Sequence, residues 1–267
     1  MPELDDLDPQ RLRSLRAVFT DIDETLSTRG KITPAAFDAL WRLHAAGVPV
    51  IPVTGRPAGW CDHIARFWPV SAVVGENGGF YFHHDGTKLQ RRYLYSAEER
   101  ARFRERLAAV RDRILAEIPG TAVASDQPYR EYDLAIDYCE DVPRLAKAHV
   151  LDIRRMFEAA GAHAKISSIH VNGWYGDFDK LSTVRLYARE QLGLDLDEAR
   201  EEFVFCGDSP NDEPLFAFFP LSFGVANVRD FLDVMERGPA FITNGEAGEG
   251  FREVADLILD ARTGKAP

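Results

Sequence analysis

Short apolar runs alternate with longer segments in which apolar residues recur at helical spacing, beginning near residue 17. This pattern predicts buried strands towards both ends of the chain, at 17–22, 48–53, 71–75, 202–206, 221–225 and 239–242. It also predicts amphipathic helices between and after them, at 34–46, 57–67, 179–192, 210–218, 228–236 and 249–260. Alternation of strand and helix is typical of a Rossmann-like parallel sheet flanked by helices, so we expect an α/β core.

The middle of the chain follows a different pattern. Alternating apolar and polar residues around His84-Asp85-Gly86 predict a β-hairpin at 78–95 that leaves the first sheet. Beyond it we expect a charged helix, two short strands, a second helix and a last strand, at 96–117, 121–125, 132–138, 142–160 and 163–171. The core is therefore split in sequence, into residues 1–82 and 173–267, by an inserted α+β domain at 83–172.

Composition limits the partners of the protein. Hydrophobic residues make up 45% of the 267 residues, which is ample for burying a core. The 43 acidic residues outnumber the 32 basic ones, and the net charge of -11 argues against nucleic acid and anionic membranes as partners. No apolar run is long enough to cross a membrane, and the acidic start Met1–Asp8 is unlike a signal peptide, so we expect a cytoplasmic protein.

The metal-binding residue types other than acids are scattered. Cys61, Cys139 and Cys206 are far apart and form no Cys-x-x-Cys pair, so we expect reduced packing residues. The seven histidines form no His-x-x-x-His pattern, which weakens a zinc interpretation.

Two carboxylates follow the first predicted strand, in the sequence Ala17-Val-Phe-Thr-Asp-Ile-Asp-Glu-Thr-Leu26. Asp21 and Asp23 would lie near the carboxyl end of that strand, where open α/β sheets bind ligands. If the extended backbone persists, residues i and i+2 point to the same side, so both acids would face one spot. Two negative charges so close need a cation or a shared proton. In isolation, however, an Asp-x-Asp sequence is more often a solvated strand end or a helix cap.

Two further polar clusters lie where core helices begin. Thr54-Gly55-Arg56 leads into the helix at 57–67, and a hydroxyl beside a glycine suits the binding of a phosphate oxygen by backbone N–H groups. The same pair is also an ordinary helix cap. Lys180 lies near a helix N-terminus, where a cation is unfavourable unless an anion is nearby, although a solvated lysine is the default alternative.

The last cluster is the most specific of these three. An apolar strand runs into Gly207 and Asp208, and Asn211-Asp212 opens the following helix. Either acid could be a cap, but if the strand ends converge, both add oxygen ligands to those of the first acid pair. Mg²⁺ prefers octahedral oxygen coordination and commonly bridges carboxylates, waters and a substrate phosphate, so this combination suggests a magnesium site.

In this order the four clusters resemble the four motifs of the haloacid dehalogenase superfamily. The matching residues are Asp21-Ile-Asp-Glu-Thr25, Thr54-Gly-Arg56, Lys180 and Gly207-Asp-Ser-Pro-Asn-Asp212. The resemblance spans about residues 15–260 and implies a Mg²⁺-dependent phosphatase that works through an aspartyl-phosphate intermediate. One residue departs from the pattern, because Glu24 stands where these phosphatases often carry glycine, and this puts the conformation of the turn in question.

The position of the inserted domain narrows the resemblance. The interval between Thr54 and Lys180 is much longer than that between Asp21 and Thr54, so the cap must lie in the second interval. Together with Glu76-Asn-Gly-Gly79, this resembles the branch with an α+β cap that includes phosphomannomutases and the phosphatases of sucrose phosphate, trehalose phosphate and mannosyl-phosphoglycerate. The resemblance implies a catalytic core, a substrate-selecting cap and a small phosphorylated metabolite as substrate, with a sugar phosphate favoured.

The resemblance also implies a role for each matching residue. Asp21 would be the nucleophile, and Asp23 would be the general acid and base. Mg²⁺ would be bound by Asp21, the backbone carbonyl of Asp23, Asp208 and, directly or through water, Asp212. The residues that would bind the phosphoryl group or brace its site are Thr54, Gly55, Lys180 and Asn211.

Candidate substrate contacts outside these motifs are Asn77, Asp126, Tyr129, Arg130 and Trp174. Arg130 could bind a second anionic group, but a surface pair with Glu131 is the more common arrangement. Tyr129 and Trp174 could stack on a sugar or pack at the domain junction.

Two rival functions use the same residues. A sugar phosphomutase would return the phosphoryl group of Asp21 to a sugar, and a phosphate-ligand sensor would be non-catalytic. A sensor has little need for Asp21, Asp23, Thr54, Lys180 and Asp208 together, so hydrolysis is the favoured prediction. We expect a monomer or small homo-oligomer that binds a small-molecule phosphoester.

Overall fold

The computed structural model describes residue 4 and residues 7–264 of the chain. The expectation about the acidic start, Met1–Asp8, therefore falls largely outside the described residues, and so do residues 265–267 of the predicted core. Within the described part, no helix is long and apolar enough to cross a membrane.

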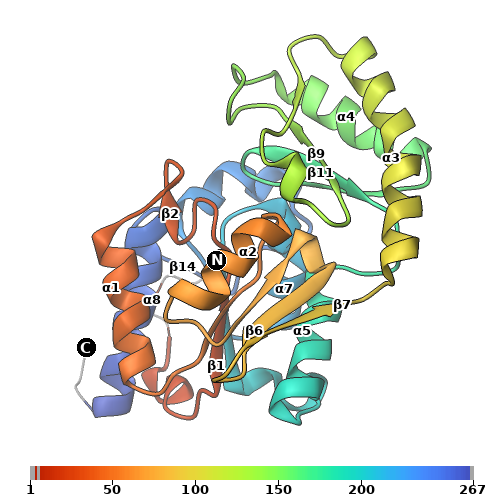
Figure 1. Cartoon of the computed structure of the whole chain (residues 1–267). Coiled ribbons are helices and arrows are strands. Elements are labelled where there is room, and N and C mark those ends of the chain that lie inside the picture. The colour runs from red at the N-terminus through yellow and green to blue at the C-terminus, as the bar shows by residue number, and fades with distance from the viewer. Residues whose placement is uncertain (1–3, 5–6, 265–267) are drawn as a thin grey trace.

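The core of the fold is a five-stranded parallel sheet (Figure 1). In spatial order its strands are β14 (Phe241–Ile242), β13 (Ser222–Gly224), β12 (Phe203–Gly207), β1 (Ala17–Thr20) and β4 (Val50–Pro52). Thr20 of β1 pairs with Cys206 of β12 on one side and with Pro52 of β4 on the other. The carboxyl ends of these strands therefore open at one edge of the sheet, and the predicted α/β core is confirmed.

Helices cover both faces of this sheet, because successive strand residues point to opposite sides. Val18 packs in one apolar cluster with residues of α1 and α8, whereas Phe19 packs in another with residues of α5 and α7. The four helices are α1 (Pro34–Ala45), α8 (Ala247–Thr263), α5 (Lys180–Tyr187) and α7 (Glu213–Phe218). The predicted helix 179–192 continues beyond α5 as one π-helical turn, and a short helix α6 (Leu196–Ala199) follows.

A three-stranded antiparallel sheet adjoins the core. Its strands are β5 (Ala72–Gly75), β6 (Phe80–His84) and β7 (Leu89–Tyr93), and helix α2 (Ala58–Phe67) packs against it. A single bridge between Val53 and Val74 connects β5 to the end of β4. The predicted hairpin is therefore present, and it extends β5. Strand β7 lies in the range assigned to the inserted domain, yet it pairs with β6 of the range assigned to the core.

A separate four-stranded antiparallel sheet lies above the core in Figure 1. Its apolar residues form a cluster with those of the two helices that cover it, α3 (Ala97–Glu117) and α4 (Lys147–Ala159). The four strands in spatial order are β10 (His163–Ile166), β11 (His170–Trp174), β9 (Leu134–Asp137) and β8 (Ala122–Val123). These elements form the α+β unit expected between the second and third motifs.

The prediction of one strand at 163–171 is wrong. Residues 167–169 form a turn between the antiparallel strands β10 and β11, and the Ser167 hydroxyl accepts hydrogen bonds from the N–H groups of Ile169 and His170. A serine that bonds to nearby backbone in this way favours a turn over a continuous strand.

The helix predicted at 228–236 is instead a 3₁₀ helix, Ala226–Val234. Only Val228 of this segment is buried, so no packed apolar stripe supports an α-helix there.

A small hairpin follows β1 along the chain. It consists of β2 (Ser27–Thr28) and β3 (Lys31–Ile32). Arg29 and Gly30 at its tip have φ values of 51° and 70°, as a tight two-residue hairpin turn requires.

Candidate active site and metal centre

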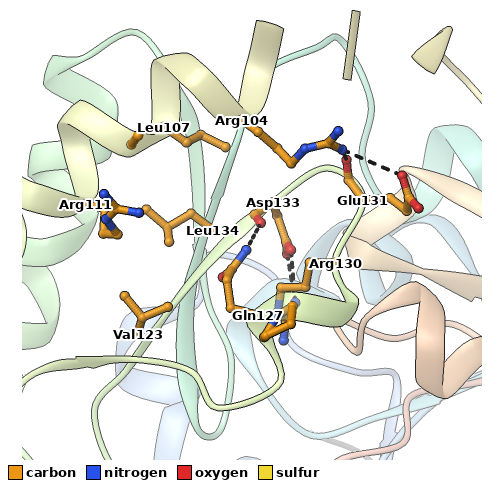
Figure 2. Close-up of a pocket in the computed structure, with 11 residues that line it drawn as sticks. Arg104, Leu107, Arg111, Val123, Gln127, Arg130, Glu131, Asp133 and Leu134 are labelled. Atoms are coloured by element: carbon orange, nitrogen blue, oxygen red, sulfur yellow. Dashed lines mark hydrogen bonds and ion pairs between the residues drawn. The ribbon is translucent and has the colours of Figure 1, made fainter. Parts of the chain in front are cut away.

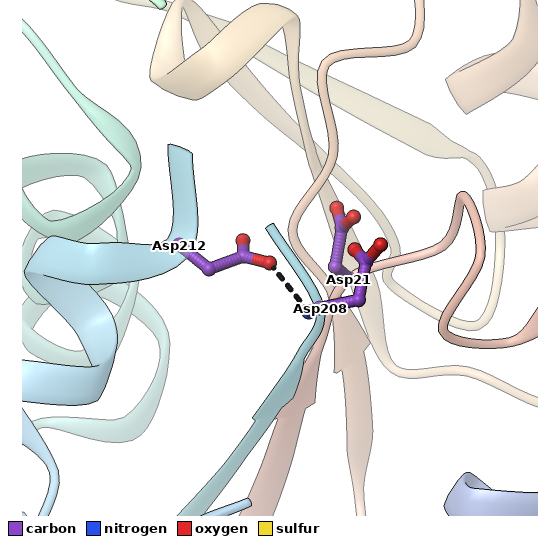
Figure 3. Close-up of side chains that lie close together, drawn as sticks. All are labelled: Asp21, Asp208 and Asp212. Carbon is purple, nitrogen blue, oxygen red and sulfur yellow. Dashed lines mark hydrogen bonds between the residues drawn. The ribbon is translucent and has the colours of Figure 1, made fainter. Parts of the chain in front are cut away.

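Strands β1 and β12 bring two acids to one point. Asp21 directly follows β1, and Asp208 directly follows β12. The N–H of Asp21 donates to the carbonyl of Cys206 at 2.8 Å, which continues the pairing of the two strands by one residue. Figure 3 shows both acids at this strand edge, with Asp212 reaching them from the start of the next helix.

Asp21, Asp208 and Asp212 form a compact buried cluster. One carboxylate oxygen of each lies within 4.8 Å of those of the other two. Burial raises the pKa of Asp21 to about 7 although Lys180 opposes this, and burial with the charges of Asp21 and Asp212 raises the pKa of Asp208 well above its usual value. Carboxylates that repel one another are stabilised by a hard divalent cation, which prefers oxygen ligands. These three residues could therefore hold such a metal.

Gly207 allows this close arrangement. A Cβ atom at this position would clash with Oδ2 of Asp212, so any larger residue would displace that acid. The same oxygen accepts the N–H groups of Asp208 and Ser209, at 3.0 and 3.3 Å. Asn211 of the same turn is buried, and its side-chain oxygen accepts the Ser209 hydroxyl at 2.8 Å.

Lys180 lies between two of the acids. It begins helix α5 directly after Asp179, whose carboxylate accepts the N–H of Ser182 as a helix cap. The Nζ of Lys180 donates to Asp21 at 2.9 Å and to Asp212 at 2.7 Å, and the side chain is only 2% exposed. Burial alone would lower the pKa of Lys180, but these carboxylates outweigh it and raise that pKa. The negative charge that favours a lysine at this helix start thus comes from Asp21 and Asp212. Contact between Lys180 and a substrate phosphate stays a prediction.

Asp23 points to a different partner. Strand β1 ends at Thr20, so the extended backbone that would have aimed Asp21 and Asp23 at one spot does not persist. The carboxylate of Asp23 instead accepts Nε of Arg56 at 2.9 Å and Nη2 of Arg56 at 2.8 Å. A two-point ion pair of this kind fixes the orientation of the carboxylate.

Arg56 is a site residue to which sequence reasoning gave no role. Its Nη2 also donates at 2.9 Å to Glu140, which follows strand β9 in the α+β unit, and its guanidinium lies 4.6 Å from the ring centre of Trp60. Glu140 in turn lies 2.8 Å from Nε2 of His170. Arg56 was visible as the last residue of Thr54-Gly-Arg56, but its partner Glu140 is distant in sequence and carried no signal.

Thr54, Gly55 and Asn77 lie side by side. The buried hydroxyl of Thr54 accepts the N–H of Arg56 at 3.0 Å, and a Cβ atom at Gly55 would lie 3.3 Å from Nδ2 of Asn77. Among the described residues, no hydrogen-bond acceptor pairs with this buried Nδ2 atom. Because buried donors are rarely left unpaired, Asn77 offers a hydrogen bond to a ligand.

Arg130 is not the surface residue expected from the sequence, and the expected pair with Glu131 is wrong. Its side chain is 1% exposed and pairs with Asp126 at 2.9 Å and with Asp133 at 3.0 Å. Its Nη1 also donates to the carbonyl of Gly55 at 2.8 Å. Asp126 and Asp133 hold the Arg130 side chain inside the protein. Its hydrogen bond to Gly55 connects the α+β unit to the core.

The two aromatic candidates differ in environment. Tyr129 is 61% exposed. Trp174 is buried, its ring stacks on those of Phe178 and His163, and its Nε1–H donates to the carbonyl of Phe178 at 3.1 Å. Packing at the domain junction therefore accounts for Trp174, whereas the ring of Tyr129 is accessible.

The turn after β1 forms although Glu24 replaces the glycine that is common in the family. The φ of Glu24, at 56°, lies in the left-handed region, which glycine adopts at the least cost. The side chain of Asn227 supports this turn, donating to the carbonyl of Glu24 at 3.0 Å and to Asp208 at 3.2 Å. Asn227 was not among the predicted site residues.

Glu76 was noted in the sequence only as part of Glu76-Asn-Gly-Gly79, with no role of its own. It is buried, and its carboxylate accepts the N–H of Ala58 in the core at 3.0 Å. It also accepts the N–H groups of Glu131, Tyr132 and Asp133, at 2.8, 2.6 and 3.2 Å. One carboxylate therefore satisfies backbone donors of both parts of the protein.

The substitution Glu76→Gln should lower the free energy of unfolding by roughly 1–3 kcal/mol, because an amide nitrogen would face buried N–H donors. Thermal or urea unfolding measures this loss. Glu105→Gln, at an exposed position of α3, is the matched control and should leave stability unchanged. Equal stability of the two variants would contradict the role given to Glu76.

A cleft of about 600 Å³ opens beside the acids, a size suited to a small molecule. One wall comes from the core and the other from the α+β unit. The residues of the first include Asp23, Arg29, Arg56, Asp208 and Asn227, and those of the second include Cys139, Glu140, Arg144 and Ser168.

A family model described as haloacid dehalogenase-like hydrolase matches residues 18–105. A protein named phosphoglycolate phosphatase, from Methanobrevibacter smithii, is 24% identical over 258 residues, which cover 92% of this chain and 99% of that relative. These matches confirm the resemblance carried by the four motifs. Residues 18–105 thus resemble the haloacid dehalogenase-like hydrolases.

Solved structures share the fold over nearly the whole chain. A protein of Thermoplasma acidophilum is 20% identical with a TM-score of 0.66, covering 92% of this chain and 98% of its own. The sucrose-phosphatase of Synechocystis is 14% identical with a TM-score of 0.61, again covering 92% and 98%. The sheet core and the inserted α+β unit are thus a shared architecture.

Proposed function

We propose that this protein is a Mg²⁺-dependent phosphatase that hydrolyses a small phosphorylated metabolite, with a sugar phosphate favoured, through an aspartyl-phosphate on Asp21. The observation that carries the proposal is the buried cluster of Asp21, Asp208 and Asp212 with Lys180 bound between two of them. The names of the phosphoglycolate phosphatase relative and of the sucrose-phosphatase support the reaction class.

In the proposed reaction, a carboxylate oxygen of Asp21 bonds to phosphorus while the bond from phosphorus to the substrate alcohol breaks. Asp23 gives a proton to that alcohol and later takes one from the water that hydrolyses the acyl phosphate. Arg56 orients the carboxylate of Asp23 through its two-point ion pair. Glu140 accepts a hydrogen bond from the same guanidinium and so helps to fix its position.

The metal would be held by the carboxylates of Asp21, Asp208 and Asp212 and by the backbone carbonyl of Asp23. When bound, a divalent cation supplies countercharge to these acids and to the phosphoryl oxygens. Lys180 adds a fixed positive charge, and Thr54, Gly55 and Asn77 add hydrogen-bond donors, with Asn211 bracing the turn that carries Asp212.

We also propose that residues 83–172 act as a cap that selects the substrate, while 1–82 and 173–267 carry the chemistry. Support comes from Glu140, which reaches Arg56 across the cleft, and from Arg130, which reaches the carbonyl of Gly55. The cytoplasmic location and the oligomeric state stay predictions from the sequence.

Removal of divalent cations should lower phosphate release from p-nitrophenyl phosphate by more than roughly 100-fold, because Lys180 alone would then offset the charges of three buried acids and of the phosphate. The measurement compares chelator-treated protein with the same sample after Mg²⁺ is restored. Full activity without metal would overturn the metal role. A sugar 1-phosphate supplied with a bisphosphate activator tests the phosphomutase alternative, which predicts the 6-phosphate isomer in place of free phosphate.

A further inference from the structure

Cavities lined by arginines border the α+β unit, and two of them differ in how their arginines are paired. The first, of about 530 Å³, lies between α3 and the segment 123–134 (Figure 2). Its Arg104 contacts Glu131, and its Arg111 contacts Asp112. Its third arginine, Arg130, pairs with Asp126 and Asp133. All three cations already have a counter-charge, so this cavity gives no reason to expect an anionic ligand.

The second cavity is the cleft beside the catalytic acids. Its arginines are Arg29, Arg56 and Arg144. Arg56 is engaged by Asp23 and Glu140. Arg29 and Arg144 are both exposed, and among the residues that the structure describes no acid forms an ion pair with either. Of these two, Arg144 is the one that the α+β unit supplies. A free guanidinium therefore lines the wall of the cleft that faces the core acids.

The backbone that carries Arg144 is held in place on both sides. The carboxylate of Asp137 accepts the three successive N–H groups of residues 139–141, each at 2.8 Å. The N–H of Leu145 donates to the carbonyl of Tyr138 at 2.9 Å. Because this loop is already ordered, binding through Arg144 costs only the ordering of its own side chain.

Arg144 also borders a neighbouring cavity of about 350 Å³, whose lining mixes apolar and charged residues. Arg144, Asp230 and Phe231 line both spaces, so Arg144 lies where the catalytic cleft meets this second cavity. Asp230 carries the opposite charge but makes no ion pair with Arg144 within the described chain. The organic part of a substrate that lies in this cleft and reaches towards the second cavity would pass this guanidinium.

We infer that the substrate carries a second anionic group besides its phosphate, and that Arg144 binds that group. The inference rests on the proposed function, because it assigns the organic part of that enzyme's substrate. A carboxylate and a second phosphate both fit, since each accepts two parallel hydrogen bonds from a guanidinium. Arg144 is a specificity residue, since it lies on the cap wall and none of the catalytic acids pairs with it.

Matched substrates that differ only in the second anion test this inference. The carboxylate pairs are phosphoglycolate with 2-hydroxyethyl phosphate, and 6-phosphogluconate with glucitol 6-phosphate. The phosphate pair is fructose 1,6-bisphosphate with fructose 6-phosphate. In at least one pair the wild-type protein with Mg²⁺ should favour the anionic member in kcat/KM by roughly tenfold or more, and that pair identifies the anion.

The substitution Arg144→Gln should remove most of this preference, and Arg144→Lys, which keeps the charge without the planar fork, should remove part of it. Arg29→Gln is the matched control, because Arg29 is an exposed arginine on the opposite wall of the same cleft. It should retain the preference. Melting curves of all three variants should match the wild type, since both side chains are exposed.

Three results would overturn the inference while leaving the proposed function intact. They are equal kcat/KM within every pair, an equal loss for both members of a pair in Arg144→Gln, and an equal loss of preference in Arg29→Gln. Failure of the wild-type protein with Mg²⁺ to release phosphate from any of these esters or from p-nitrophenyl phosphate would instead overturn the proposed function, and the inference with it.

Discussion

Asp21→Asn should abolish the release of phosphate, with kcat lowered by more than roughly ten-thousandfold, because an amide cannot form the acyl phosphate. The substitution keeps the size of the side chain and leaves an oxygen that can accept the hydrogen bond from Lys180. The fold should therefore survive, and thermal melting would verify this. Steady-state release of p-nitrophenol and of phosphate measures the loss.

The matched control for this variant is Asp177→Asn. Asp177 is an exposed acid outside the cluster, so its neutralisation should leave kcat within about twofold of the wild type. Substantial phosphatase activity of Asp21→Asn, in a preparation free of contaminating phosphatases, would rule out Asp21 as the nucleophile.

Lys180→Ala should lower both the affinity for phosphate and kcat, together by roughly 100- to 1000-fold in kcat/KM. The reason is that the negative charge of the phosphoryl group would lose a fixed cation in a site where burial strengthens every charge interaction. The effect is measured by kcat/KM for p-nitrophenyl phosphate and by inhibition with inorganic phosphate.

Loss of Lys180 also removes the only cation that contacts Asp21 and Asp212 among the described ion pairs. The metal-free variant should therefore melt below the wild type, and added Mg²⁺ should restore part of the difference. Lys180→Met, which keeps most of the side-chain volume, separates the loss of charge from the loss of packing. Unchanged rate and phosphate affinity in both variants would remove Lys180 from the site.

The sheet core was predictable because its determinants are local. Val18 and Phe19 belong to a short apolar run that ends in polar residues, and the same arrangement recurs at Phe203–Gly207. Parallel strands that alternate with helices then place their carboxyl ends at one edge, which brings Asp21 and Asp208 together. The distance between Asp21 and Asp208 in the sequence does not by itself indicate that they lie close together in the fold.

The parts that could not be predicted depend on which charges become buried. Arg130 reads as a surface residue because a local pair with Glu131 is possible, yet Asp126 and Asp133 hold it inside. Glu140 carries no motif, and only the fold brings it to Arg56. Ion pairs between distant positions leave no periodic signal, so sequence patterns cannot reveal them.

The direction of Asp23 was missed for a related reason. A period of two applies only while the backbone is extended, and β1 ends at Thr20. The two acids of the first motif are therefore not equivalent. Asp21 belongs to the buried acid cluster, whereas Asp23 pairs with Arg56, which in turn pairs with Glu140 of the α+β unit.

The most direct test of the central claim is a rapid-quench experiment on Asp23→Asn with p-nitrophenyl phosphate. The nitrophenolate leaves without a proton, so Asp21 should still be phosphorylated, whereas the water that cleaves the acyl phosphate would lack its base. The account predicts a burst of about one equivalent of nitrophenol, slow turnover afterwards, and a phosphoryl group on the peptide that contains Asp21. A phosphoryl group on a different residue, or steady turnover at the wild-type rate without a burst, would contradict it.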